Sequence, residues 1–233
     1  MGLLMLLGLI VMYAIGPERA NFLNTLPSTT FYSQNYFVIK QVISLGIALF
    51  AFAVMAFLPF QTLKKYGWRL IQIGFGLSVL LFITGNVLHL VPSTLGAYRW
   101  FYLGPLGSFQ PAEVLKLALL VYMAGFLGKR YEEGNINNLK QTVYPAGAMA
   151  AAALFIVIVV QKDLGTGIAI ASMLATMFIV STMSWKILGK IALIGVICGV
   201  LAIVTSPHRM ERLETFMSGD SAATTQNAED RDN

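Results

Sequence analysis

The sequence has little charge and almost no cysteine. Charged residues make up 12% of its 233 positions, and the one cysteine, Cys198, lies within an apolar run. Soluble domains carry about a quarter of their residues as Asp, Glu, Lys or Arg, so too few polar side chains are present here to cover a soluble surface. The lone cysteine excludes an intramolecular disulfide and a cysteine-based metal site.

Motifs for metals and nucleotides are also missing from the sequence. Its two histidines, His89 and His208, are isolated, and no H-x-x-x-H, C-x-x-C or P-loop pattern occurs. These absences argue against a structural metal and against a nucleotide site. The formal net charge of +5 does not indicate nucleic-acid binding, because the Lys and Arg residues form short clusters between apolar runs and no continuous basic face.

Long apolar segments take up most of the chain, whose mean hydropathy is +0.71. A transmembrane helix needs about 20 apolar residues. The first segment has no Lys or Arg before it, so we interpret it as a spanning helix and not as a signal peptide. We predict an all-α polytopic membrane protein with about seven transmembrane helices over residues 1–205, followed by a polar segment, 206–233, that cannot fold alone. The seven segments run over roughly 2–16, 37–58, 70–91, 112–127, 144–160, 164–181 and 187–205.

Positive charges predict how these helices cross the membrane. The second, fourth and sixth loops carry eight Lys and Arg residues, whereas the first, third and fifth carry four. Because cytoplasmic loops are enriched in Lys and Arg, we place the even loops and the amino terminus in the cytoplasm, and residues 206–233 outside. The even loops hold Lys64, Lys65, Arg69, Lys129, Arg130, Lys140, Lys186 and Lys190, and the odd loops hold Arg19, Lys40, Arg99 and Lys162.

One stretch, residues 96–116, joins an aromatic loop to the fourth segment. Pro111 suits the first helical turn, where its missing N–H is harmless. Glu113 then lies near the positive end of the helix dipole, and Lys116 follows on the same face. Their ion pair could simply anchor the helix start, but ionisable residues inside a membrane are costly and indicate a functional role. Arg99 could bind a diphosphate with forked hydrogen bonds or meet lipid phosphates at the interface.

A second polar stretch, Gln161 to Gly167, interrupts two apolar runs so briefly that the fifth and sixth helices must form a tight hairpin. Asp163 is the natural cap of the sixth helix, and capping alone would explain it. Lys162 could extend to the interface. A third stretch, 208–216, suits a short amphipathic helix on the outer surface or an ordinary turn.

Together, four patterns resemble the SEDS family of FtsW, RodA and SpoVE, in order and spacing. Any one of them alone is a weak signal, but their joint occurrence is specific. Three positions depart from the family patterns: Tyr98 stands where many members have a second arginine, Ala112 replaces a serine, and Lys162 replaces a common proline. The patterns are Gly96-Ala-Tyr-Arg-Trp, Phe109-Gln-Pro-Ala-Glu-Val-Leu-Lys, Gln161-Lys-Asp-Leu-Gly-Thr and Arg209-Met-Glu-Arg-Leu-Glu-Thr-Phe.

The resemblance implies the amino-terminal portion of a ten-helix peptidoglycan glycosyltransferase. Such proteins polymerise lipid II into glycan strands at the outer face of the cytoplasmic membrane during cell division or elongation, beside a class B penicillin-binding protein transpeptidase and other divisome or elongasome proteins. It implies substrate-binding roles for Arg99, Glu113, Lys116 and Asp163. The family's catalytic aspartate is expected beyond Asn233, in a long extracellular loop that begins with residues 206–233, so this chain alone is expected to be inactive.

Two points stay open from the sequence. Either cationic side chains or a divalent cation, Mg²⁺ or Mn²⁺, could stabilise the departing lipid diphosphate, although no residue of this chain is assigned to a metal. A membrane protein with Glu113 and Lys116 in its helices could also transport a lipid-linked precursor, or act as a non-catalytic scaffold for division or elongation proteins.

Overall fold

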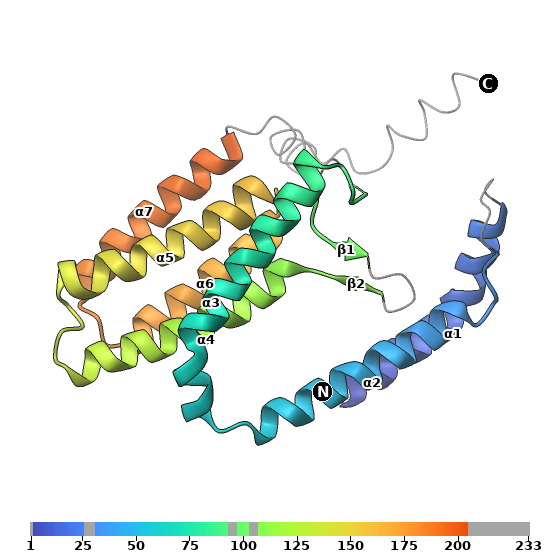
Figure 1. The fold of residues 1–233 in the computed structure, drawn as a ribbon, viewed down its shortest axis with the longest axis horizontal. Coiled ribbons are helices and arrows are strands. Elements are labelled where there is room, and N and C mark those ends of the chain that lie inside the picture. Colours follow the sequence, from blue (N-terminus) through green and yellow to red (C-terminus); the bar gives the residue numbers. More distant parts are fainter. Residues whose placement is uncertain (1, 26–30, 93–96, 103–106, 205–233) are drawn as a thin grey trace. The chain divides into compact units, whose positions relative to one another are not determined.

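The computed structural model describes residues 2–25, 31–92, 97–102 and 107–204, the last four of these as backbone only. Helices dominate the described chain (Figure 1), which forms two compact units. The first unit comprises residues 1–65 and 101–109, and the second, called here the main unit, comprises residues 66–100 and 110–233. The predicted surface helix at 208–216 and the polar segment 206–233 lie outside the described residues.

Two packed helices, α1 (Gly2–Thr25) and α2 (Tyr36–Phe57), make up most of the first unit. Gly16 lies at their contact, where an added Cβ would meet the Cβ of Phe37 at 3.5 Å. The side chain of Asn24 joins the end of α1 to the following segment, because it donates to the carbonyl of Tyr32 at 2.9 Å and accepts from its N–H at 2.8 Å. Two short strands also belong to this unit: β1 (Phe101–Tyr102) pairs antiparallel with β2 (Ser108–Phe109).

The first segment was predicted to end at Gly16, which is wrong. Helix α1 continues through Pro17 to Thr25. Proline removes one backbone hydrogen bond, but helices in membrane proteins tolerate this loss when local adjustments or neighbouring groups satisfy the freed carbonyl. Arg19 therefore lies on a helix and not in a loop.

Eight helical elements follow α2 in the described chain. Helix α3 (Phe60–Phe82) starts in the first unit and continues into the main unit, where the π-helix η1 (Ile83–Val87) extends it. Helix α4 (Pro111–Glu132) comes next. The π-helix η3 (Leu139–Val143), α5 (Tyr144–Leu154) and the π-helix η4 (Phe155–Val160) form one continuous span. Helices α6 (Leu164–Val180) and α7 (Trp185–Val204) complete the described chain.

A core of apolar side chains holds the main unit together. It lies between α3, α4, the α5–η4 span and α6, which pack against one another, and α7 packs against α6. Gly74 allows α3 to approach α4 closely, because a Cβ there would come within 2.9 Å of the Cα of Leu115. Small residues serve this purpose in membrane helices generally. The buried core residues are Ile71, Ala112, Leu115, Ala118, Leu119, Met123, Leu127, Ile136, Ala146, Ala150, Ala153, Val157, Ile170, Leu174, Phe178 and Met183.

The structure confirms the predicted class of an all-helical membrane protein. Among the described residues, five helices are long and apolar enough to cross a membrane, and α6 is a shorter apolar helix. The start predicted for the third segment is wrong, since α3 begins ten residues earlier, at Phe60. Lys64, Lys65 and Arg69 therefore lie on its first turns. No glycine or proline interrupts residues 60–66, so the helix continues past its apolar part.

Candidate functional site

The start of α4 carries the first part of the site. Gln110 is extended, with φ −106° and ψ 112°, and Pro111 occupies the beginning of the helix, as predicted. The backbone N–H of Glu113 donates to the Gln110 carbonyl at 3.1 Å, which closes the first turn. Proline suits this position because its fixed φ already matches the helix and no hydrogen bond is lost.

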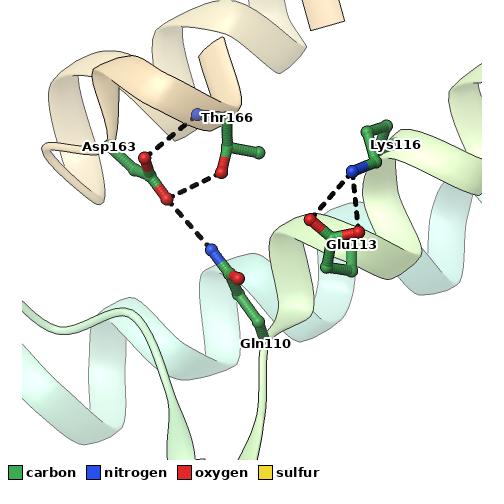
Figure 2. Close-up of polar contacts among 5 residues, drawn as sticks. All are labelled: Gln110, Glu113, Lys116, Asp163 and Thr166. Carbon is green, nitrogen blue, oxygen red and sulfur yellow. Dashed lines mark hydrogen bonds and ion pairs between the residues drawn. The ribbon is translucent and has the colours of Figure 1, made fainter. Parts of the chain in front are cut away.

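The predicted ion pair on α4 is present. The Nζ of Lys116 lies 2.7 Å from Oε2 and 2.8 Å from Oε1 of Glu113 (Figure 2). The side chain of Glu113 is 53% exposed and that of Lys116 is 32% exposed. The pair therefore lies on an open face of the helix, where both groups can exchange their mutual contact for a ligand at modest cost.

The hairpin between η4 and α6 carries the second part of the site. Only residues 161–163 separate the two helices. Asp163 caps α6 as predicted: its Oδ1 accepts from the Thr166 N–H at 3.1 Å, and its Oδ2 accepts from the Thr166 hydroxyl at 2.8 Å. Gly167 lies against Ile158 so closely that a Cβ there would overlap the isoleucine side chain. This contact keeps the two helices together just behind the cap.

Gln110 and Asp163 join the two parts. The side-chain amide Nε2 of Gln110 donates to the Asp163 Oδ2 at 3.0 Å (Figure 2). The Asp163 carboxylate thus accepts three hydrogen bonds, two from its own helix and one from the segment before α4. Sequence reasoning missed Gln110, although it belongs to the quoted Phe109-Gln-Pro pattern.

Arg99 approaches the same hairpin from the segment after η1. Its Nε donates to the carbonyl of Gln161 at 3.3 Å, and its Nη2 donates to the carbonyl of Lys162 at 2.6 Å. These carbonyls follow the end of η4, where the helix dipole is negative and a cation is favourable. Two of the five guanidinium N–H groups therefore donate to the hairpin, and no other described residue accepts from the rest.

The residues before Arg99 fix its position. Gly85 on η1 lies under the ring of Tyr98, and a Cβ there would come within 2.5 Å of that ring. The Tyr98 hydroxyl lies 3.3 Å from Nδ1 of His89. Tyr98, which departs from the family pattern, therefore anchors this segment to the end of η1.

Gln161, the first residue of the hairpin, is buried, which the sequence did not predict. Its side chain is 2% exposed, and neither Nε2 nor Oε1 has a hydrogen-bond partner among the described residues. An unpaired buried amide costs about 1–3 kcal/mol for each unsatisfied group. No pattern in the sequence indicated its burial, since glutamine in a short hairpin is ordinarily exposed.

The four predicted site residues therefore fall into two groups. Arg99 binds the backbone of the hairpin that carries Asp163. Asp163 is bonded to Gln110, whereas Glu113 and Lys116 bind each other on α4 (Figure 2). Among the described residues, the two groups are joined by the backbone hydrogen bond from the Glu113 N–H to the Gln110 carbonyl, and no side-chain hydrogen bond joins them. Their roles in substrate binding stay predictions.

A divalent cation finds no ready set of ligands in the described part of the chain. No group of three or more His, Cys, Asp or Glu side chains comes together there. Glu113 is bound to Lys116, and Asp163 accepts hydrogen bonds from neutral donors. We therefore derive no chemical step through a metal.

Comparison with known proteins identifies the fold and the family. The FtsW/RodA/SpoVE family model, described as "Cell cycle protein", matches residues 1–227. The chain belongs to this family. FtsW/RodA/SpoVE relatives include a "Probable peptidoglycan glycosyltransferase FtsW" of Polynucleobacter necessarius, 29% identical over 92% of this chain and 48% of the relative. Another of the same name, from Alteromonas naphthalenivorans, is 31% identical over 78% of this chain and 34% of the relative. The chain thus spans about half the length, or less, of these relatives.

Solved structures support the same fold. A mutant of the rod shape determining protein RodA of Thermus thermophilus superimposes with a TM-score of 0.57, at 24% identity, over 85% of this chain and 59% of that one. A structure described as "Structural coordination of polymerization and crosslinking by a peptidoglycan synthase complex" gives a TM-score of 0.58, at 23% identity, over 91% of this chain. The fold class expected from the resemblance is therefore confirmed.

Proposed function

We propose that the full-length protein carrying this chain is a peptidoglycan glycosyltransferase that polymerises lipid II at the outer face of the cytoplasmic membrane, during cell division or elongation. The family membership and the names of the relatives support this activity. The observation that carries the proposal is the polar cluster of Arg99, Gln110 and Asp163, because separate family motifs supply it and it lies at one end of apolar helices.

The distribution of charge supports an outward-facing site. In the main unit, Lys129 and Arg130 lie in the last turn of α4, whereas Glu113 lies in its first turn. The positive-inside rule places the Lys-rich end of α4 in the cytoplasm and therefore the Glu113 end outside. A helix of 22 residues is about 33 Å long, which is enough to separate the two ends by the hydrocarbon core.

Glycosyl transfer to a lipid-linked chain needs a base for the acceptor hydroxyl and cations for the departing diphosphate. The base is the family aspartate, expected beyond Asn233. In this chain, Arg99 and Lys116 supply positive charge: Arg99 has guanidinium N–H groups that no described residue binds, and Lys116 can leave Glu113 for a phosphate oxygen. Asp163 acts as a positioning residue, because its carboxylate is bonded to Gln110 and Thr166.

A class B penicillin-binding protein transpeptidase is the partner that this proposal implies, because polymerised strands must be cross-linked. One solved structure of the same fold is described as a complex that coordinates polymerisation and crosslinking, which supports such an assembly here. Other divisome or elongasome proteins would set where the complex works.

The experiment that tests the proposed function uses purified full-length protein, a class B transpeptidase and lipid II in vesicles. Glycan strands longer than the substrate are expected on a denaturing gel. A second assay, in the same vesicles, measures the accessibility of fluorescent lipid II to an outside reductant. Glycan strands that form while lipid II stays in its original leaflet support the polymerase. Faster movement of lipid II between the leaflets, without glycan strands, would support the transporter. If neither strands nor movement of lipid II is detected, the scaffold is the better account.

A further inference from the structure

An apolar groove lies between the carboxyl-terminal parts of α4 and α6, within the main unit. Its volume is about 500 Å³, which is in the range of sites that bind small molecules. Ala124 and Gly128 line the groove from α4, and Met177 and Val180 line it from α6. Thr182, in the turn after α6, also lines it. The candidate site lies at the beginnings of both helices, so the groove is separate from it.

The groove lies at the depth of the membrane's acyl chains. Gln110 and Asp163, the residues directly before α4 and α6, are joined by a hydrogen bond of 3.0 Å, so the two helices begin at one level. A helix of 22 residues such as α4 is about 33 Å long, and one of 17 residues such as α6 is about 26 Å long. The hydrocarbon core is about 30 Å thick, so α6 ends within it. Thr176 and Val180 on its last turns are exposed, so the groove is open to lipid chains.

Two of the hydroxyl groups that line the groove are already bonded within α6. The Thr176 hydroxyl donates to the Ser172 carbonyl at 2.9 Å, and the Ser181 hydroxyl donates to the Phe178 carbonyl at 2.7 Å. Serine and threonine in helices commonly form such bonds to the preceding turn. The wall that α6 offers to an occupant is therefore apolar.

Small residues keep the α4 side of the groove open. An added Cβ at Gly128 would meet nothing within 4 Å, whereas one at Gly74 would come within 2.9 Å of the Cα of Leu115. Close packing within the described main unit therefore requires Gly74 but does not require Gly128. Ala124 lies one turn before Gly128 on the same face of α4. From α6, the unbranched and adaptable side chain of Met177 can follow an occupant of irregular shape.

The charged residues beside the groove nearly balance. Lys129 and Arg130 lie in the last turn of α4, and Glu132 and Glu133 follow them. Glu133 is 2.8 Å from Arg130 and 3.8 Å from Lys129. Lys186, in the first turn of α7, adds one cation, and exposed charges of this kind contribute little to binding. A headgroup here meets a nearly neutral surface, which favours recognition of an acyl chain over recognition of headgroup charge.

We propose that this groove binds an acyl chain of a membrane phospholipid and that the bound lipid holds α4 against α6. The inference goes beyond the proposed function, because the groove and the Glu113–Lys116 pair lie at opposite ends of α4. The charge distribution that places Glu113 outside places the groove in the cytoplasmic leaflet. Tyr131 lines the groove and is 59% exposed, and an aromatic ring in this place favours the level of the headgroups.

A protein helix is a different class of occupant, and the geometry favours the lipid chain. Helices α4 and α6 pack against each other, and the axes of packed helices lie about 8–10 Å apart. A third helix, about 10 Å wide, can lie over a groove between them but cannot enter it. A chain of methylene groups is thin enough to enter and to contact both walls.

The experiment uses native mass spectrometry to measure phospholipid bound to the purified full-length protein, delipidated in detergent and titrated with dioleoyl phosphatidylcholine. Gly128→Phe fills the groove from α4, and Ala124→Leu fills it partly. Gly147→Phe is the matched control, because Gly147 is exposed on α5 and an added Cβ there also meets nothing within 4 Å. Gly147→Phe should bind the lipid like wild type, Gly128→Phe at least about tenfold more weakly, and Ala124→Leu between the two.

Thermal stability gives a second readout. Dioleoyl phosphatidylcholine should raise the melting temperature of wild type and of Gly147→Phe but not that of Gly128→Phe, because a ligand stabilises only a folded state that binds it. Dihexanoyl phosphatidylcholine should bind wild type at least about tenfold more weakly than the dioleoyl lipid, since each buried methylene adds to the affinity. Dioleoyl phosphatidylglycerol should bind within about fivefold of dioleoyl phosphatidylcholine. These lipid comparisons need no variant, so they test the groove even if the substituted proteins fail to fold.

Several results would overturn the proposal. One is equal binding of dioleoyl phosphatidylcholine to wild type and Gly128→Phe, and another is equal binding of the dihexanoyl and dioleoyl lipids to wild type. A wild-type dimer that Gly128→Phe makes monomeric, with lipid bound to neither, would assign the groove to a second copy of the chain. If wild type binds no lipid and Gly128→Phe melts well below Gly147→Phe, another part of the full-length protein fills the groove.

Discussion

The amide of Gln110 donates a hydrogen bond to the carboxylate of Asp163 across 3.0 Å, and the two residues are 53 positions apart in the chain. This bond fixes the start of α4 against the cap of α6. Gln110 is 8% exposed, so its amide has little access to water as an alternative partner. The bond therefore positions the hairpin relative to the Glu113–Lys116 pair on the next turn of α4.

Replacing Gln110 with leucine should loosen the start of α6. Asp163 would lose one of its three donors while keeping Thr166, so we expect a loss of about 1–2 kcal/mol of stability. Hydrogen exchange at the Thr166 and Gly167 amides should become faster. Gln141→Leu is the matched control, because Gln141 is exposed and its side chain makes no described bond. Equal exchange in both variants would show that the Gln110–Asp163 bond contributes nothing.

A lysine at position 99 should not take over the role of Arg99 in holding the hairpin. A lysine carries the same charge but lacks the planar fork that reaches the carbonyls of Gln161 and Lys162 together. We expect faster amide exchange across residues 161–164 and at least a several-fold loss of polymerisation. Wild-type exchange in Arg99→Lys would mean that charge alone holds the hairpin.

Gly74→Ala should disturb the contact between α3 and α4. The new methyl group would lie 2.9 Å from the Cα of Leu115, and backbone on both sides leaves little room to adjust. Overpacking of this kind costs about 1–3 kcal/mol. Gly76→Ala, two residues on, meets nothing within 4 Å and gains helix propensity, so its melting temperature should equal or exceed that of wild type. A stable Gly74→Ala protein would contradict the packing described here.

Gly167→Ala should separate η4 from α6. Its methyl group would overlap Ile158, whereas the methyl group of Gly165→Ala would meet only Asp163 Oδ1, at 3.7 Å. We expect Gly167→Ala to lower the melting temperature and Gly165→Ala to change it little. A double variant, Gly167→Ala with Ile158→Val, should recover part of the loss, because the smaller side chain makes room. No recovery in that variant would argue against Ile158 as the obstacle.

Short-range features of the site could be predicted from the sequence. The Asp163 cap, the Pro111 start of α4 and the Glu113–Lys116 pair each depend on residues within one helical turn, and all are present. Apolar length likewise predicted the helices of the main unit. The end of α1 and the start of α3 were missed because helix-forming residues extend past the apolar segments.

Long-range contacts could not be predicted in the same way. Nothing in the spacing of Gln110 and Asp163 indicates that they meet, and Arg99 has no local feature that distinguishes a ligand-binding guanidinium from one bonded to backbone carbonyls. Both contacts depend on how α4, η4 and α6 pack. The buried amide of Gln161 depends on the same packing.

The central claim is that the Glu113 end of α4 belongs to a lipid II polymerase site, and one comparison tests it most directly. The initial rate of glycan-strand formation is measured for the full-length protein with its transpeptidase, as wild type, Lys116→Ala and Lys129→Ala. Lys116 pairs with Glu113 at 2.7 Å, and Lys129 pairs at 3.8 Å with Glu133, the residue directly after α4, so the two pairs lie at opposite ends of the helix. We predict that Lys129→Ala polymerises like wild type and that Lys116→Ala loses at least about tenfold in rate. A Lys116→Ala protein that polymerises at the wild-type rate, with Lys129→Ala equally active, would contradict the account.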